Sequence, residues 1–344
     1  MTSPMLPGPA APEPARVPDP APAPAPAPAG RLRRTLRALA VLGTLPYIGL
    51  KVAWVAGSEA GIPEGSVLLE HPGLMAVVNG ISVVADAAVV LLAMLLTRPW
   101  GLKVRAWLLA FPVWAAMGLL APIMTAYPAQ VVVALLGGPG SASAGPPDEP
   151  FLDPWVFPVV YGGFIVQGLT LGILFALYSR DRWAHLWRGR LGELPATVTG
   201  PGVRACAVAG AVLALVPAAM HLLWACGLTA DLSPRPAAVQ DADKAVVDAA
   251  RAVFLLVAAG TVPALALRRP AGRRVRTTMA LAWVSSGAAG CWGAYMALVA
   301  LLPLADPGEE PTALMTATYA GEMITGFLLA GCLAVILSRR SRTA

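Results

Sequence analysis

The sequence predicts an all-α membrane protein with eight transmembrane helices, arranged as a parallel internal repeat of four helices plus four. Three observations predict it. Of the 344 residues, 57% are hydrophobic and only 13% are charged, whereas soluble proteins carry about 25% charged residues. Long apolar runs recur along the whole chain. A motif around a tryptophan at the end of the first run returns at the end of the fifth, which indicates a duplication.

Residues 1–34 form a segment rich in alanine and proline. Proline removes a backbone donor and favours polyproline II, so we expect a disordered cytoplasmic tail. The segment has no apolar centre of the kind that a signal peptide needs. We place the first four-helix repeat at residues 35–182 and the second at residues 203–340.

The apolar runs that follow are the candidate transmembrane helices. A helix that crosses a hydrocarbon core of about 30 Å needs about 20 apolar residues. There are eight such runs, at about residues 36–57, 74–97, 105–126, 156–178, 204–226, 245–267, 277–303 and 314–337.

Charge predicts how these helices are oriented. If the N-terminus is cytoplasmic, the cytoplasmic segments hold 21 of the 25 Lys and Arg residues. Acidic residues follow the opposite pattern and gather in the outer segments. Because the Lys and Arg bias sets orientation, we expect both termini to be cytoplasmic. The basic clusters between apolar runs are therefore topology signals, and we expect no nucleic-acid partner.

The duplication rests on three motifs that return in the same order. The matched pairs are Trp54 with Trp224, Arg98-Pro99-Trp100-Gly101 with Arg269-Pro270-Ala271-Gly272, and Tyr161-x-Gly163 with Tyr319-x-Gly321. Each half holds an even number of crossings, so both halves insert in the same direction. We expect a pseudo-two-fold axis along the membrane normal. The alternative is that polytopic proteins reuse similar residues at helix ends.

Six ionisable residues lie inside the runs: Lys51, Asp86, His221, Asp248, Arg251 and Glu322. Such residues are costly in a membrane and usually face the bundle interior or a water-filled cavity. Lys51 and Asp86 lean toward each other from the first two runs, so we predict an ion pair between them. Further hydrogen bonds would support it, with Asn79, Tyr47 and Tyr161 as the candidate partners.

We predict a second, structural ion pair between Asp248 and Arg251, which are three residues apart on one helix. Glu322 has no obvious local partner and aligns with Phe164 of the first half. His221 aligns approximately with Lys51 and would act either as a hydrogen bonder between helices or as a proton relay. We take Lys51, Asp86, His221 and Glu322 as an intramembrane polar site.

The chain lacks the usual signatures of catalysis. It contains no phosphate-binding loop, no His-Glu-x-x-His motif and no Gly-x-Ser-x-Gly nucleophile elbow. Its four cysteines, Cys206, Cys226, Cys291 and Cys332, form no CxxC pair. We therefore expect no enzyme activity, no cofactor and no metal site.

The pattern Pro-Tyr-x-x-Leu-Lys-x-x-Trp-x-x-Gly spans Pro46 to Gly57 and follows the Ala/Pro-rich tail. Together these features resemble uncharacterised multi-pass integral membrane proteins of high-GC Gram-positive bacteria. The resemblance implies a bacterial plasma-membrane location and implies no activity.

Three functions stay open from the sequence. The first is a small-solute permease in which Lys51, Asp86, His221 and Glu322 line an outward-facing polar cavity between the halves. The second is a non-catalytic membrane scaffold or accessory subunit, in which the charges only lock helices together. The third, an intramembrane enzyme acting on lipid or quinone, has no catalytic spacing to support it. The lipid bilayer is the one partner that the sequence identifies.

Overall fold

The computed structural model describes residues 30–69, 72–136, 152–228, 232, 242–301 and 310–343. Its long helices are α1 (Arg31–Val55), α2 (Pro72–Thr97), α3 (Ala106–Leu135), α4 (Val156–Trp187), α5 (Pro201–Ala225), α7 (Ala242–Leu267), α8 (Val275–Leu301) and α9 (Ala313–Thr343). Short 3-10 turns η1 (Val67–Leu69), η2 (Pro99–Lys103), η3 (Leu191–Glu193) and η4 (Ala196–Val198) lie in the connections. The predicted tail lies outside the described residues, except for its last few, which begin α1.

The predicted fold class is confirmed. In the described chain, eight helices are long and apolar enough to cross a membrane. Several helices run further than the apolar runs that predicted them, most clearly α3 and α4. Helix α3 contains three prolines and continues past the last of them, Pro128, to Leu135. Helix α4 continues to Trp187 through a polar segment with a kink at Trp183. The α4 extension is held because Arg182 donates to the carbonyl of Val104, 2.9 Å away.

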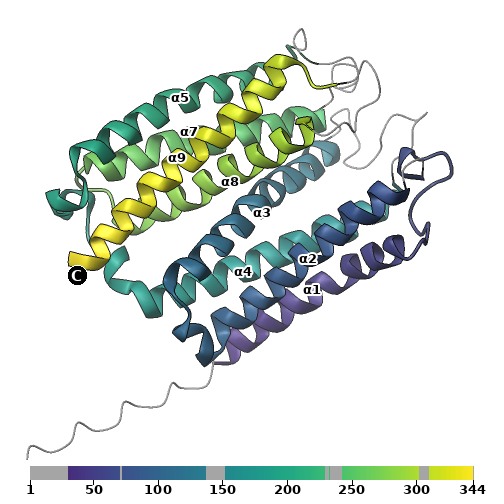
Figure 1. Cartoon of the computed structure of the whole chain (residues 1–344), viewed down its shortest axis with the longest axis horizontal. Helices are drawn as coiled ribbons and strands as arrows, with labels where there is room; N and C mark the ends of the chain where they lie inside the picture. The colour runs from purple at the N-terminus through teal and green to yellow at the C-terminus, as the bar shows by residue number, and fades with distance from the viewer. Residues whose placement is uncertain are drawn as a thin grey trace, which may run out of the picture.

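The helices form two groups along the chain (Figure 1). Helices α5, α7, α8 and α9 pack together, and α1, α2 and α4 pack together, with α3 lying between the groups. Helix α1 contacts α2 and α4, just as α5 contacts α7 and α9. Helix α3 contacts α4, just as α8 contacts α9. These contacts are the ones that a four-plus-four repeat requires, and the duplication itself stays a prediction.

The two halves meet where α3 crosses α8. A Cβ added to Gly118 would lie 2.4 Å from the carbonyl oxygen of Gly287, so the two backbones touch. Trp114 Nε1 donates to Ser286 Oγ at 3.3 Å, and Trp292 Nε1 donates to the carbonyl of Leu119 at 2.9 Å. Small residues allow this close approach, as is typical of helix interfaces in membranes.

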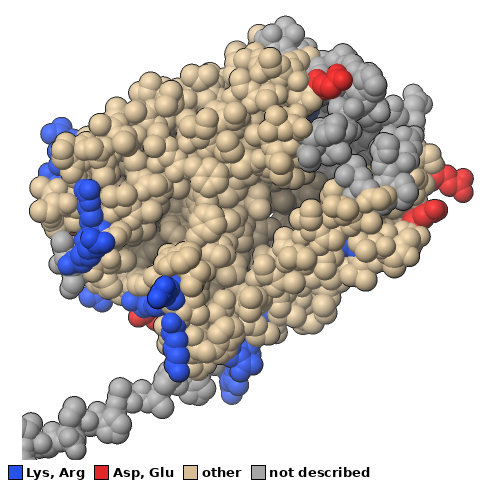
Figure 2. All heavy atoms as spheres, in the orientation of Figure 1, with Lys and Arg blue, Asp and Glu red and all other residues tan. Residues whose placement is uncertain are grey.

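Charged side chains gather at the two ends of the bundle (Figure 2). Lys and Arg cover the end at which α1 begins and α9 ends, and most of the visible Asp and Glu lie at the opposite end. We call the first of these the basic end. The long apolar surfaces between the ends match the hydrocarbon core of a bilayer.

Candidate intramembrane polar site

The four residues of the predicted polar site fall into two separate clusters, one in each half. Lys51 and Asp86 meet between α1 and α2, and His221 and Glu322 meet between α5 and α9. All four are buried, with at most 9% of any residue exposed. The structure thus brings the predicted residues together in pairs within each half.

The first-half cluster contains the predicted ion pair. Lys51 Nζ donates to Asp86 Oδ2 at 2.9 Å. The hydroxyl of Tyr47, itself fully buried, donates to the other carboxylate oxygen, Asp86 Oδ1, at 3.3 Å. Both oxygens of the carboxylate therefore have a donor, which offsets part of the cost of removing the charges from water.

Aromatic rings close this cluster on its other sides. Lys51 Nζ lies 5.1 Å from the ring centroid of Tyr47 and 5.5 Å from that of Phe164 on α4. Both distances suit cation–π attraction. Of the other predicted hydrogen-bond partners, Asn79 donates to the carbonyl of Met75 instead, and Tyr161 stacks near Tyr127.

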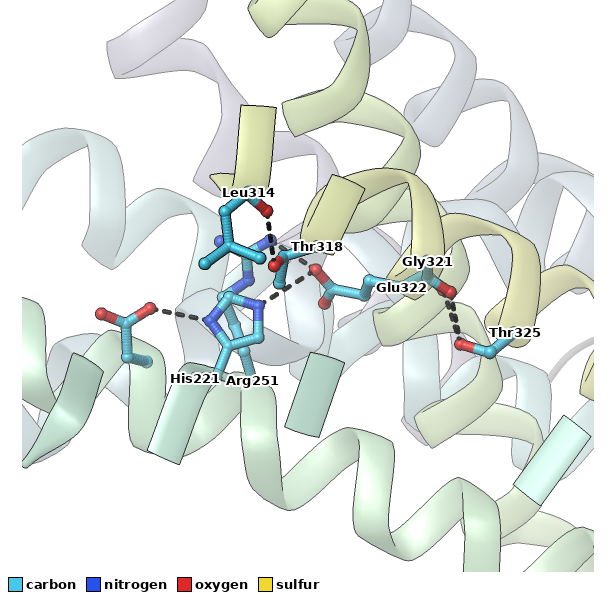
Figure 3. Close-up of polar contacts among 8 residues, drawn as sticks. His221, Arg251, Leu314, Thr318, Gly321, Glu322 and Thr325 are labelled. Atoms are coloured by element: carbon cyan, nitrogen blue, oxygen red, sulfur yellow. Dashed lines mark hydrogen bonds and ion pairs between the residues drawn. The ribbon is translucent and has the colours of Figure 1, made fainter. Parts of the chain in front are cut away.

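The second-half cluster is larger and has four charged or ionisable members. His221 Nδ1 lies 2.9 Å from Asp248 Oδ1 on α7, and His221 Nε2 lies 3.4 Å from Glu322 Oε2 on α9. Arg251 on α7 forms an ion pair with Glu322 Oε2. Figure 3 shows the His221 imidazole facing the Glu322 carboxylate, with Arg251 beside it. Glu322, which had no predicted partner, therefore has two.

The predicted pairing of Asp248 with Arg251 is not the one that the structure contains. Among the ion pairs of the described residues, Asp248 pairs with His221 and Arg251 pairs with Glu322. The physical reason is that each side chain finds an oppositely charged or hydrogen-bonding partner on a neighbouring helix. These two cross-helix pairs connect α7 to both α5 and α9.

The walls of this cluster are tightly packed. The Arg251 guanidinium lies 5.0 Å from the ring centroid of Tyr319, and the His221 ring meets Trp224 edge-on at 5.1 Å. Close to Glu322, a Cβ on Gly293 would lie 2.3 Å from the backbone nitrogen of Met323. Helix α8 therefore touches the backbone of α9 beside Glu322.

The His221 ring lies between two acids. A neutral imidazole has one N–H and can donate to one carboxylate, whereas a protonated imidazole can donate to both. The cluster holds two carboxylates and one guanidinium, so one additional proton on His221 or a carboxyl makes it electrically neutral. A neutral cluster is strongly favoured inside a membrane. The arrangement is thus chemically suited to binding one proton.

The two clusters draw on the same helices of each half, but not on matching positions throughout. Lys51 and His221 lie on the first helix of each half, and Asp86 and Asp248 lie on the second. The spacing of 170 residues between Trp54 and Trp224 pairs Asp86 with Leu256 and not with Asp248. Phe164, which aligns with Glu322, contacts Lys51 just as Glu322 contacts His221. The second half therefore has the carboxylate of Glu322 where the predicted alignment gives the first half the ring of Phe164. Arg251 supplies the positive charge that balances this carboxylate.

A cavity of about 710 Å³ lies elsewhere, and none of the four predicted residues lines it. Its walls come from α3, α4 and α8, so it lies between the halves, and five arginines are among the residues that line it. The sequence indicated these arginines only as topology signals. The grouping of these arginines in the connections between helices was the one sign of this cavity in the sequence.

In the described part of the chain, no group of three or more His, Cys, Asp or Glu residues has the arrangement of a metal site. Comparison with protein-family models, with curated proteins and with solved structures finds no match to this chain.

Proposed function

We propose that this polytopic membrane protein is a small-solute permease whose solute occupies the cavity between the two halves. The observation that carries the proposal is the position and size of that cavity. Ligand pockets have volumes of roughly 300–1,000 Å³, and this one holds about 710 Å³. In transporters built from repeats, the substrate site lies at the interface between the repeats.

The cavity replaces the predicted outward-facing one as the route for the solute. Arginines of the basic end line it, and the Lys and Arg bias favours a cytoplasmic location for that end. The buried clusters then do not contact the solute, because none of their residues lines the cavity. The second-half cluster, with His221 between two carboxylates, would carry a proton that links solute movement to the proton gradient.

The experiment is to fill the cavity without disturbing the protein core. Ala176 on α4 and Ala280 on α8 line the cavity and are exposed. We expect Ala176→Trp and Ala280→Trp to abolish solute uptake, measured across a broad metabolite panel in cells that express the chain. Each tryptophan occupies space that the solute needs.

Matched controls come from the same two helices. Ile173 and Leu281 are 45% and 44% exposed and do not line the cavity. Ile173→Trp and Leu281→Trp should leave uptake unchanged, because these side chains face the surrounding lipid. Unaltered uptake in both cavity-filling variants, or no uptake of any panel solute by the unmodified chain, would refute the permease proposal.

A scaffold or accessory subunit is the second candidate, and one observation favours it. Both buried clusters are closed, with Lys51 paired to Asp86 and Arg251 paired to Glu322 inside their own halves. Such closed pairs fix helices against each other without needing a solute. A scaffold would keep a stoichiometric partner in pull-downs from native membranes, and Ala280→Trp would leave that partner bound.

A further inference from the structure

The cavity has an apolar interior at membrane depth. Met117, Phe175, Trp283 and Val284 contribute to its walls, and the Phe175 and Trp283 rings stack across the two halves at 5.4 Å. Gly172 and Val284 lie eight residues from Arg180 and Arg276, a distance of about 12 Å along each helix. The cavity therefore runs from a charged rim into a region that accepts hydrocarbon.

The rim of the cavity is strongly cationic. Arg180, Arg188, Arg190, Arg274 and Arg276 line it, together with a single acid, Glu193. Glu193 is engaged, because its carboxylate accepts the backbone N–H of Arg190 at 2.8 Å. Within the described residues, no carboxylate pairs with Arg188, Arg274 or Arg276. The rim thus offers several guanidinium groups to an anion.

Two connecting segments hold this rim in place. The backbone of Leu191 donates to the carbonyl of Arg273 at 2.9 Å, and Val275 donates to Gly189 at 3.1 Å. These bonds join the segment after α4 to the segment before α8. An isolated antiparallel β-bridge joins Arg190 and Arg274. The backbone of these two arginines is therefore held in place, which lowers the ordering cost of binding a ligand.

Other residues of the cavity add hydrogen-bond donors without acceptors. Ser179 Oγ, Trp187 Nε1 and Trp283 Nε1 are buried and have no hydrogen-bond partner among the described residues. All three residues line the cavity, and Ser179 is 4% exposed. These three atoms have almost no accessible surface, so a ligand could reach them only if the cavity wall shifted, and the guanidinium groups of the rim are the donors that an anion can reach.

From this arrangement we infer that the cavity binds an anionic phospholipid, with its phosphate among the arginines of the rim and its acyl chain against the aromatic wall. Guanidinium groups bind phosphate oxygens by paired, charge-assisted hydrogen bonds. A basic pocket between transmembrane helices is a suitable site for an anionic headgroup. A lipid in the cavity would occupy the space that the proposed function gives to a small solute, so the two proposals name competing occupants and the binding of phosphatidylglycerol decides between them.

Binding can be measured directly on the purified full-length chain. Native mass spectrometry, with the protein released from detergent, would give the Kd of added phosphatidylglycerol, with phosphatidylcholine as the neutral comparison. We expect phosphatidylglycerol to bind at least about tenfold more tightly, because only its net charge matches the rim. Equal affinity for the two lipids would overturn the inference.

Two arginine variants locate the headgroup, and a neighbour provides the control. Arg274→Gln and Arg276→Gln each remove a charge from the rim and should weaken phosphatidylglycerol binding by about tenfold. Arg273→Gln removes the same charge from the same segment, but Arg273 does not line the cavity. The Kd of the Arg273→Gln variant for phosphatidylglycerol should equal that of the unmodified chain. An equal loss in all three variants would mean attraction to the surface charge alone and would overturn the site.

Two further probes separate the lipid from its headgroup. Inorganic phosphate and glycerol 3-phosphate carry the anion without the acyl chain, and we expect neither to compete with phosphatidylglycerol. Effective competition by either would show a site for a small phosphate and would overturn the lipid assignment. Ala280→Trp, which fills the apolar part, should weaken phosphatidylglycerol binding, whereas Leu281→Trp should not. Because this is a binding assay, a chain that fails to transport any solute can still pass it.

Discussion

The two halves of this protein accommodate buried charge in different ways. In the first half, Lys51 meets Asp86, and aromatic rings close the site. In the second, His221 lies between Asp248 and Glu322, and Arg251 pairs with Glu322. The first half therefore holds one ion pair, and the second holds a network of four ionisable side chains on three helices.

The difference shows how a buried network can grow without leaving a charge unpaired. The predicted alignment of the halves pairs Glu322 with Phe164, and a buried carboxylate at this place would be costly without a partner. Arg251 on the neighbouring helix pairs with that carboxylate and keeps the cluster balanced. Glu322 and Arg251 both lie in the second half, so the second half is the better candidate for a proton-linked role. The first half is the better candidate for a purely structural ion pair.

The sharpest test of this comparison is to remove Arg251. Arg251→Leu leaves Glu322, only 1% exposed, without its main counter-charge. Breaking a buried ion pair from one side costs about 3–5 kcal/mol. We expect a loss of that size in the free energy of unfolding, measured by chemical denaturation of the purified protein in mixed micelles.

The double variant R251L/E322L is the control for this prediction. It removes both charges, so most of the lost stability should return, since apolar residues often replace a buried pair at little cost. If the double variant is as unstable as Arg251→Leu, the effect comes from packing around Tyr319, and the ion pair is not what stabilises this half.

The equivalent change in the first half should be smaller. Asp86→Leu leaves Lys51 unpaired, but Lys51 is 9% exposed and has a flexible stem that can carry its charge toward polar surroundings. We expect a loss of roughly 2 kcal/mol in the same assay. Asp181→Leu, which removes a surface carboxylate paired with Arg33, should cost below about 1 kcal/mol. If Asp86→Leu lowered the free energy of unfolding as much as Arg251→Leu does, the contrast between the halves would disappear.

Much of the fold could be predicted from the sequence, because each helix carries its own apolar length. The Lys51–Asp86 pair was also predictable, since depth along adjacent helices and the lean of side chains bring the two groups together. Helix ends were harder. Helix α4 passes the predicted end of its run because Arg182 and its neighbours make contacts that no local pattern encodes.

The second-half network could not be predicted from spacing. A separation of three residues indicates that Asp248 and Arg251 share a face, but the packing of α5 and α9 decides which partner each one takes. The cavity was missed for a related reason. It exists because α3, α4 and α8 leave a gap between the halves, and a gap between helices leaves no signature in the order of residues.

The smallest expected effect concerns the hydrogen bond that completes the first-half cluster. Tyr47→Phe keeps the buried ring but removes the hydroxyl that donates to Asp86 Oδ1 at 3.3 Å. We expect the free energy of unfolding to fall by about 1 kcal/mol, the usual net worth of such a bond. Tyr127→Phe is the control, because the Tyr127 hydroxyl makes no hydrogen bond to any described residue. Equal losses in both variants would mean that the Tyr47 hydroxyl does not stabilise the Lys51–Asp86 pair. The first-half cluster would then depend on the ion pair alone.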